Sequence, residues 1–227
     1  MRSNIEINHG DCMEALREMP DNAFELAIVD PPYGIGADKA QNSAAERRIK
    51  ADGKSKAGRG WKQYKDTEWD NATPTDEYFT ELFRVSKRQI IWGGNYFPLI
   101  WSVSNSFIVW NKMQRDFSLA DGELAWYSEE NKAMRTFDFS RGGALSDNNK
   151  NGGRFHPTQK PVALYKWLLQ NYAKEGDRIL DTHIGSGSIA IACWDAKFDL
   201  VGYELDEDYH KAATARLKEH QSQGQLF

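Results

Sequence analysis

The sequence predicts an α/β fold with a largely parallel sheet. Short apolar runs typical of strands alternate along the chain with segments of helical periodicity. The alternation is clearest from residue 178 to residue 220, where strand, glycine-opened helix, strand and helix follow one another. The chain has 227 residues, of which 40% are hydrophobic and 12% aromatic, so it can build a substantial core. One domain over 1–227, with insertions, is favoured over two.

The first elements are predicted between residues 5 and 30. Residues 5–8 form a short strand. A helix is expected over 11–19, because Cys12 and Leu16 belong to a set of apolar residues at helical spacing. The apolar run that follows indicates a buried strand over 25–30.

The middle of the chain combines strands with two insertions. Residues 37–75 lack clear periodicity and are expected to form a long insertion. Thr75 then opens a helix with a capping pattern. Strands are predicted at 89–92, 106–110 and 123–127. Residues 128–155 contain two Gly-Gly pairs and are expected to be a second, loop-like insertion.

The last elements follow one another without long interruptions. A helix is expected over 161–173, with Pro161 in its first turn. Strand 178–181, helix 185–196, strand 200–205 and helix 207–220 come next, and the crossover between the parallel strands should be right-handed. Residues 221–227 form a tail.

Charge is distributed unevenly along the chain. The formal net charge is −4, yet residues 37–66 contain nine Lys or Arg and four Asp or Glu, which gives 9 − 4 = +5. The remainder is therefore −4 − 5 = −9. A basic segment on an acidic body is compatible with one positive face that binds nucleic acid.

Several classes of protein find little support in the sequence. The two cysteines, Cys12 and Cys193, lie far apart, no CxxC occurs and the five histidines are scattered, so no metal site is expected. The N-terminus has no apolar signal region and no run approaches 18 apolar residues, so we expect no membrane partner and a cytoplasmic protein.

The most informative stretch is Asp30-Pro31-Pro32-Tyr33, at the end of a predicted buried strand. Two prolines fix the backbone and remove two N–H donors, which leaves carbonyl acceptors beside the Asp30 carboxylate. A planar exocyclic amino group, which donates two hydrogens, fits such a site. The Tyr33 ring can stack on the heterocycle that carries the amine.

A second motif follows strand 178–181 and opens a helix. Within residues 181–190, Gly185, Gly187 and Ala190 satisfy G-x-G-x-x-A, which permits a tight turn, close approach of a ligand and close helix packing. Glu204 ends the next strand, where its carboxylate can accept both hydrogens of a ribose diol. A nucleotide site is therefore predicted, although a tight β–α turn without a ligand has the same pattern.

The glycine loop alone does not distinguish S-adenosylmethionine from a nicotinamide nucleotide. The Asp30 motif and a third block, His156-Pro157-Thr158-Gln159-Lys160-Pro161, favour S-adenosylmethionine. Thr158 and Lys160 are candidates to hold the methionine carboxylate, although a helix N-terminus with a solvated lysine is the plainer interpretation.

The three blocks together resemble the β-type DNA amino-methyltransferases of bacteria and their phages. The resemblance covers about residues 8–36, 76–127 and 154–217. It implies a Rossmann-like methyltransferase fold, with a seven-stranded, mostly parallel sheet flanked by helices. It also implies that Asp11, in Gly10-Asp11-Cys12, lies by the cofactor adenine. The predicted cofactor-binding residues are Asp11, Thr158, Lys160, Asp181, His183, Gly185, Gly187, Ser188 and Glu204.

The glycine loop departs from the family pattern Asp-Pro-Phe-x-Gly-Ser-Gly-Thr. Thr182-His183-Ile184 stands in place of Pro-Phe-x, and Ser188 replaces the threonine. His183 is still expected to lie against the cofactor.

The implied reaction is transfer of a methyl group to adenine N6 of a base flipped out of double-stranded DNA. In this hypothesis Asp30 and the Pro31 carbonyl accept the amino hydrogens, so that the nitrogen lone pair points at the methyl group. Cytosine N4 is the alternative acceptor, and the Asp at the first motif position favours adenine. An RNA or protein amino-methyltransferase, a catalytically dead DNA-binding module and a nicotinamide dehydrogenase are the rival functions.

Basic and aromatic side chains in the insertions are candidates to hold phosphates or to wedge at a flipped base. A solvated loop is the alternative interpretation. The predicted DNA-binding residues are Arg47, Arg48, Lys54, Lys56, Arg59, Trp61, Arg135 and Arg141.

The C-terminal tail is similar to the Gln-x-x-Leu-Phe peptide that partners of the bacterial sliding clamp insert into the clamp. Gln223, Leu226 and Phe227 carry this likeness. A tail that packs locally or frays is the alternative. The recognition sequence, a companion restriction enzyme of a restriction-modification pair, and the choice between monomer and homodimer stay open.

Overall fold

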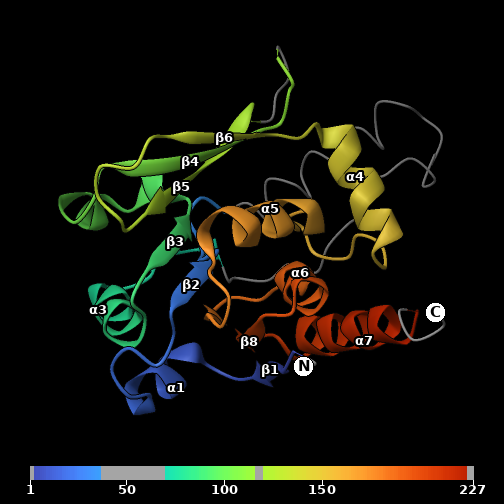
Figure 1. Ribbon diagram of the computed structural model, residues 1–227, viewed down its shortest axis with the longest axis horizontal. Helices are drawn as coiled ribbons and strands as arrows, with labels where there is room; N and C mark the ends of the chain where they lie inside the picture. The colour runs from blue at the N-terminus through green and yellow to red at the C-terminus, as the bar shows by residue number, and fades with distance from the viewer. Residues whose placement is uncertain (1–2, 37–69, 116–119, 224–227) are drawn as a thin grey trace.

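The computed structural model describes residues 3–36, 70–115 and 120–223. Within them one sheet contains eight strands in the order β1-β8-β7-β2-β3-β5-β4-β6 (Figure 1). Neighbouring strands pair in parallel, except that β5 is antiparallel to both β3 and β4. The strands are β1 (Ile5–His9), β2 (Leu26–Val29), β3 (Gln89–Trp92), β4 (Ser106–Asn111), β5 (Gly122–Tyr127), β6 (Arg135–Asp138), β7 (Arg178–Asp181) and β8 (Asp199–Glu204).

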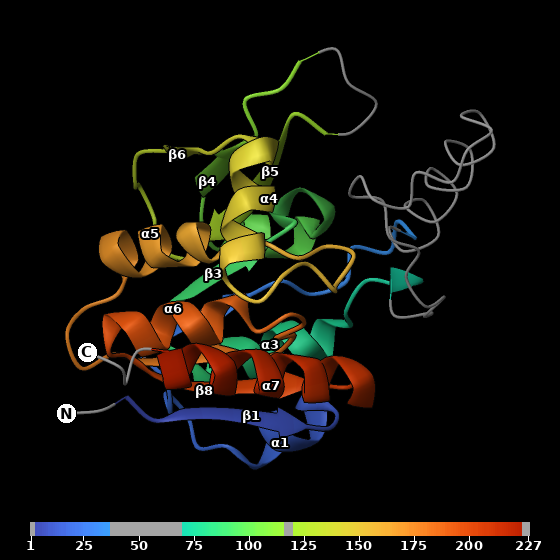
Figure 2. The ribbon, with the colours of Figure 1, turned by 90° about the vertical axis from the view of Figure 1, so that its right-hand side faces the viewer.

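Helices cover both faces of the sheet (Figures 1 and 2). On one face α5 packs against α6, and α6 packs against α7; on the other face α1 packs against α3. None of the helices in the described parts of the chain is long and apolar enough to cross a membrane. The helices are α1 (Cys12–Glu18), α3 (Asp76–Val85), α4 (Arg141–Lys150), α5 (Val162–Tyr172), α6 (Ser188–Ala196) and α7 (Glu207–Gln223), with short 3-10 helices η2 (Gly94–Tyr96) and η3 (Pro98–Ser102).

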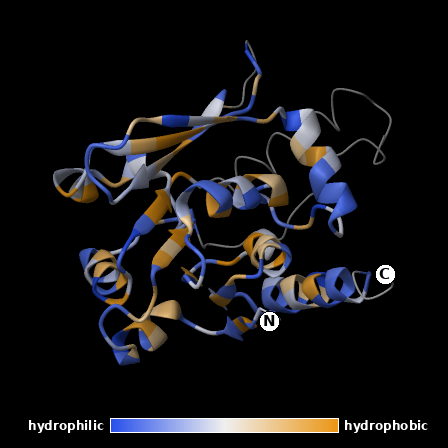
Figure 3. Ribbon diagram, in the orientation of Figure 1, coloured by the Kyte–Doolittle hydropathy of each residue, from blue (hydrophilic) through white to orange (hydrophobic). Residues whose placement is uncertain are grey.

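The central strands divide the core into two halves because successive side chains of a strand point to opposite faces. Leu26 and Ile28 of β2 face α5 and α6, whereas Ala27 and Val29 face α1 and α3. All four are fully buried. Figure 3 shows this band of hydrophobic residues along the middle of the sheet and a mostly hydrophilic α7. Burial on both faces explains why β2 lacks an alternating pattern.

The strand order places the two predicted motifs side by side. β7 and β2 are parallel neighbours, with Ala27 opposite Leu180. The chain continues from β7 to β8 on one side and from β2 to β3 on the other, so the boundary between β7 and β2 is a topological switch point. Ligands of open α/β sheets bind at the carboxyl ends of the strands at such a point. The glycine loop and Asp30 both begin there.

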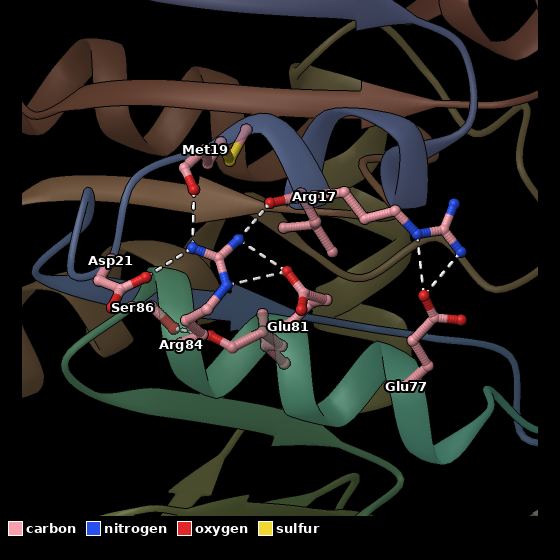
Figure 4. A network of polar contacts seen from close by, with 9 residues as sticks. Arg17, Met19, Asp21, Glu77, Glu81, Arg84 and Ser86 are labelled. Carbon is pink, nitrogen blue, oxygen red and sulfur yellow. Dashed lines mark hydrogen bonds and ion pairs between the residues drawn. The ribbon is translucent and has the colours of Figure 1, made fainter.

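Arg84, near the end of α3, fastens α1 to α3 (Figure 4). Its guanidinium donates to the carbonyl oxygens of Leu16 and Met19 at 2.8 and 2.7 Å. These carbonyls lie at the C-terminal end of α1, where Met19 is the C-cap residue. The same guanidinium pairs with Asp21 and Glu81 at 2.7 Å each.

The structure differs from the sequence prediction in the segment 128–155. That segment was expected to be loop-like, but it contains β6 at the sheet edge and the ten-residue helix α4. β6 adds an eighth strand to the seven that the family resemblance implies. The helix after the glycine loop begins at Ser188 rather than at 185, because Gly185 and Gly187 have φ of +51° and +70° and form the turn before it.

Candidate active site

Asp30 follows β2 directly, and both oxygens of its carboxylate have partners. The Tyr33 hydroxyl donates to Oδ1 at 2.5 Å, and the Lys160 ammonium forms an ion pair with Oδ2. Burial raises the pKa of Asp30, while the Lys160 ammonium opposes that shift. The structure thus brings together two predicted catalytic residues and one residue predicted to bind the cofactor.

Asp70 fixes the loop that follows the Pro-Pro pair. Its Oδ1 accepts hydrogen bonds from the backbone N–H groups of Tyr33 and Gly34 at 2.7 and 2.9 Å. Asp70 is 1% exposed, so these bonds are formed away from water, where they are strong. The sequence analysis missed this residue because Asp70 lies 37 positions after Tyr33, at the end of an insertion without periodicity.

The Tyr33 ring is packed among residues that follow β3. It stacks on Tyr96, with centroids 5.1 Å apart and planes inclined by 16°, and it meets Phe97 edge to face. Gly93 has φ of +71° and lies so close that a Cβ there would stand 2.2 Å from Tyr33 Cε1. The position of the Tyr33 ring is therefore fixed by Tyr96, Phe97 and Gly93.

Lys160 is buried between two carboxylates. Its Nζ contacts Asp30 and stands 3.3 Å from Glu123 Oε2, and Lys112 pairs with the other oxygen of Glu123 at 2.6 Å. The Lys160 side chain is 3% exposed, so it is not a solvated lysine. A buried ammonium needs anions around it, and Lys160 has two of them in Asp30 and Glu123.

Ion pairing outweighs burial in setting the pKa values of Lys160 and Glu123. Burial alone would lower the pKa of Lys160, but Asp30 and Glu123 more than offset it and the pKa is raised. Burial alone would raise the pKa of Glu123, but Lys160 and Lys112 lower it to about 2. Glu123 lies on β5, far from any recognised motif, and the sequence analysis did not single it out.

Glu204 and Gly185 form the other half of the site. Glu204, the last residue of β8, accepts hydrogen bonds from the backbone N–H groups of Gly185 and Asp206 at 2.9 Å each. Burial raises its pKa. The N–H of Gly10 binds the Glu204 carbonyl at 3.0 Å, which places the neighbouring Asp11 at the same edge. Asp11 caps α1 by accepting from Met13 N.

Gly187 and Ser188 face the interior rather than the open edge of the sheet. A Cβ on Gly187 would stand 3.1 Å from Cβ of Ala213 in α7, so this glycine permits close packing of α7 against the loop. Ser188 Oγ accepts from the guanidinium of Arg216 at 3.0 Å, and the same nitrogen donates to the Ser186 carbonyl at 2.8 Å. Arg216, which the sequence analysis missed, thus bonds the glycine loop from α7.

His183 and Asp181 stand where the loop leaves β7. The backbone N–H of His183 donates to Asp181 Oδ1 at 3.0 Å, and its ring meets Tyr78 of α3 edge to face. Burial lowers the pKa of His183 to about 4, with Asp11 opposing the shift. Burial also raises the pKa of Asp181 to about 8. A neutral His183 imidazole offers a flat, uncharged surface to a ligand.

In the block 156–161, the side-chain amide of Gln159 forms hydrogen bonds with the backbone of the preceding residues. The Gln159 amide accepts from the backbone N–H of Phe155 at 3.1 Å and donates to the Gly153 carbonyl at 2.9 Å. His156 lies beside Gly185, about 3.5 Å from where a Cβ would stand. Thr158 Oγ1 is 3.2 Å from His156 Nδ1. Thr158 thus lies at the glycine loop, whereas Lys160, two residues later, reaches Asp30.

The carboxylates of Glu204 and Asp11 could accept hydrogens from the hydroxyl and amino groups of an adenosine derivative. Glu204 lies at the end of β8, and Asp11 lies at the same edge of the sheet, after β1. A Cβ built on Gly185 would meet the His156 ring at 3.5 Å, so the block 156–161 lies against this turn. Among the described residues no group of three or more His, Cys, Asp or Glu is placed to hold a metal ion.

Most predicted DNA-binding residues lie outside the described part of the chain. Arg47, Arg48, Lys54, Lys56, Arg59 and Trp61 belong to this group, as do Leu226 and Phe227 of the tail. Arg135 is exposed on the edge strand β6, and Arg141 is partly buried at the start of α4. Gln223 is the last residue of α7.

Comparison with known proteins connects this arrangement to DNA methylation. A family model described as DNA methylase matches residues 24–215. The type II methyltransferase M.HpaI of Haemophilus parainfluenzae is 25% identical over 91% of this chain and 72% of its own length. The putative methylase YubD of Escherichia coli K12 is 25% identical over 92% of this chain and 88% of its own.

Solved structures share the fold. The complex of M1.HpyAVI with S-adenosylmethionine matches with a TM-score of 0.60 and 19% identity, over 93% of this chain and 99% of the other. The cytosine-N4-specific PvuII DNA methyltransferase matches with a TM-score of 0.55 and 13% identity, over 98% and 92%. The family match covers both the Asp30 motif and the glycine loop. The chain therefore belongs to the DNA methylase family, as a DNA amino-methyltransferase of the adenine-N6 or cytosine-N4 type that uses S-adenosylmethionine.

Proposed function

We propose that the protein methylates adenine N6 in double-stranded DNA, with Asp30 as the residue that accepts the target amine. The observation that carries the proposal is the position of Asp30, at the end of β2 and next to the glycine loop that follows β7. The partly buried carboxylate in this position already holds one nitrogen cation, the Lys160 ammonium. An amino group with two hydrogens is a similar donor.

The residues around Asp30 position the amine rather than attack it. The amino nitrogen of adenine is a weak nucleophile because its lone pair is delocalised into the ring. Asp30 and the Pro31 carbonyl accept its two hydrogens and orient the lone pair toward the cofactor side of the site. S-adenosylmethionine, when bound, supplies an electrophilic methyl group. Asp30 takes up the proton that the nitrogen loses as the new bond forms.

The amine is out of reach inside a duplex, so the proposal includes a flipped base. Tyr33 supplies an aromatic surface beside Asp30, and its hydroxyl keeps the ring aligned with the carboxylate. Basic residues of the segment 37–66 and Arg135 would hold the backbone phosphates. The tail residues Gln223, Leu226 and Phe227 would tether the enzyme to a sliding clamp.

Cytosine N4 is the second candidate acceptor, because its amine presents the same two hydrogens to Asp30. The Asp at the first position of the motif favours adenine. Methylation of cytosine C5 finds no support, since that chemistry needs a thiolate. Both cysteines of the chain are buried, and burial raises the pKa of Cys12 to about 12 and that of Cys193 well above its usual value.

The role of Asp30 is tested with Asp30→Ala and the isosteric Asp30→Asn. Both variants should lower methyl transfer to unmethylated plasmid DNA by at least about 100-fold, because the amine loses its charged acceptor. Binding of S-adenosylmethionine, measured by calorimetry, should persist. Asp195→Asn is the matched control, since it removes a partly buried carboxylate paired with Lys166 elsewhere in the fold. Near-normal transfer by Asp30→Asn would remove Asp30 from the mechanism.

A further inference from the structure

Lys160 presents a problem for the proposed reaction. Both oxygens of Asp30 are engaged, one by the Tyr33 hydroxyl and one by the Lys160 ammonium. The target amine needs one of these oxygens. Tyr33 is held by its packing against Gly93 and Tyr96, so Lys160 is the partner that can move to make room at Asp30.

Glu123 offers Lys160 a second anion within reach. Its Oε2 lies 3.3 Å from Lys160 Nζ, while its Oε1 is held by Lys112 at 2.6 Å. Lys160 can therefore leave Asp30 without becoming an unpaired charge in a buried place, which would be costly. The Trp92 ring, with its centroid 5.2 Å from the same nitrogen, lines the site on another side.

We propose that Glu123 is a positioning residue for methyl transfer, which receives the Lys160 ammonium when the target amine takes the place of that ammonium on Asp30. Two carboxylates share one ammonium in the free enzyme, and the incoming base shifts the ammonium toward Glu123. Lys160 stays close enough to Asp30 to favour its ionised, accepting form. The inference rests on the proposed function, because it takes Asp30 as the acceptor of the amine.

Other ionisable groups face Asp30 and are unchanged by the variants below. They are Tyr33 from its own loop, Tyr78 from α3, Tyr165 from α5 and Asp181 from β7. Each is present in every variant, so a change in pH dependence is assigned to Lys160 and Glu123.

The two side chains should shift the pH dependence of transfer in opposite directions. Lys160→Met removes the cation that favours ionised Asp30, so the acid limb of the single-turnover rate moves to higher pH by about one unit or more. Glu123→Gln removes a carboxylate that disfavours ionised Asp30 and leaves Lys160 bound to Asp30. The acid limb then moves to lower pH, and the rate at pH 8 falls about tenfold. Glu123→Asp, which keeps the charge, should recover part of this rate.

Glu123 should affect the rate of methyl transfer only through its contact with Lys160. In the Lys160→Met background, Glu123→Gln should therefore change the rate by less than about threefold, a non-additive result. Asp177→Asn is the matched control, because it breaks another buried ion pair, with Arg88. It should lower the melting temperature without moving the acid limb.

All rates are measured with labelled S-adenosylmethionine and unmethylated plasmid DNA. A Glu123→Gln enzyme with a rate within about twofold of wild type and an unmoved acid limb would overturn the inference. Equal loss at every pH in Glu123→Gln and Asp177→Asn would also overturn it, because it would show a structural role. Retained transfer by Asp30→Asn would instead refute the proposed function itself.

Discussion

The position of the Tyr33 ring requires a residue without a side chain at Gly93. Gly93 follows β3 and has φ of +71°, a conformation that an L-residue adopts with strain. A Cβ at this position would lie 2.2 Å from the Tyr33 ring. The hydrogen bond of Tyr33 to Asp30 therefore depends on a residue 60 positions away that carries no functional group.

Gly93→Ala should displace the Tyr33 ring and lower the rate of methyl transfer by about tenfold or more. Each 1.4 kcal/mol added to the activation free energy lowers a rate about tenfold. The unfolding free energy should fall by about 1 kcal/mol from the backbone strain. Gly176→Ala is the control, because Gly176 has φ of +87° but open space around its Cβ. It should lose similar stability, seen by urea unfolding, with normal transfer. Equal rates for the two variants would show that Gly93 does not position Tyr33.

Sequence motifs predict residues that have a local pattern in the sequence. They do not predict residues whose partners are distant in the sequence and are brought close only by the fold. Asp30, Gly185 and Glu204 were recognised because each has a local pattern at a strand end. Asp70 and Glu123 were missed, since their partners Tyr33 and Lys160 are brought to them by the fold. Lys160 was singled out from the sequence, but its partner Glu123 was not. Glu123 lies on β5, and the pairing of β5 with β3 brings it to the site.

At the scale of elements, α7 supports the glycine loop through Arg216. This guanidinium donates to Ser186 and Ser188 at the loop and to the Asn151 carbonyl. It is 4% exposed, so its loss leaves buried acceptors without a donor. Burial lowers its pKa to about 10, a value at which it is still charged near neutral pH.

Arg216→Met should lower the unfolding free energy by about 1–3 kcal/mol, the usual cost of removing a buried charged donor. It should also weaken binding of S-adenosylmethionine, because the loop before α6 loses its support. Lys218→Met is the control, since Lys218 is exposed on the same helix. Urea unfolding and calorimetry measure the two effects. Unchanged cofactor affinity in Arg216→Met would contradict the supporting role.

The elements that escaped prediction are those with weak local signals. α4 reads Arg-Gly-Gly-Ala-Leu-Ser-Asp-Asn-Asn-Lys, and two glycines in its first turn disfavour a helix. The Ser140 side chain caps it by accepting from Gly143 N at 3.0 Å. β6 is a short, mostly exposed strand that forms by pairing with β4 at the sheet edge. Helices and strands with a continuous apolar face, such as β3 and α5, were predicted to within one residue at each end.

At the scale of the whole molecule, function follows from the order of the strands. The Asp30 motif comes early and the glycine loop 150 residues later, yet β2 and β7 are neighbours at the switch point. The Asp30 motif and the glycine loop therefore meet at one edge of the sheet. The family resemblance predicted this meeting, since the sequence patterns alone leave the order of the strands undetermined.

The most direct measurement is identification of the methylated product. The protein is incubated with unmethylated DNA and labelled S-adenosylmethionine, the DNA is digested to nucleosides, and the labelled nucleoside is identified by mass spectrometry. We predict N6-methyladenine in the wild-type reaction and no labelled nucleoside with Asp30→Ala. N4-methylcytosine would keep the mechanism and change the base. Label in 5-methylcytosine, or no labelled nucleoside despite cofactor binding, would contradict transfer to an amine held by Asp30.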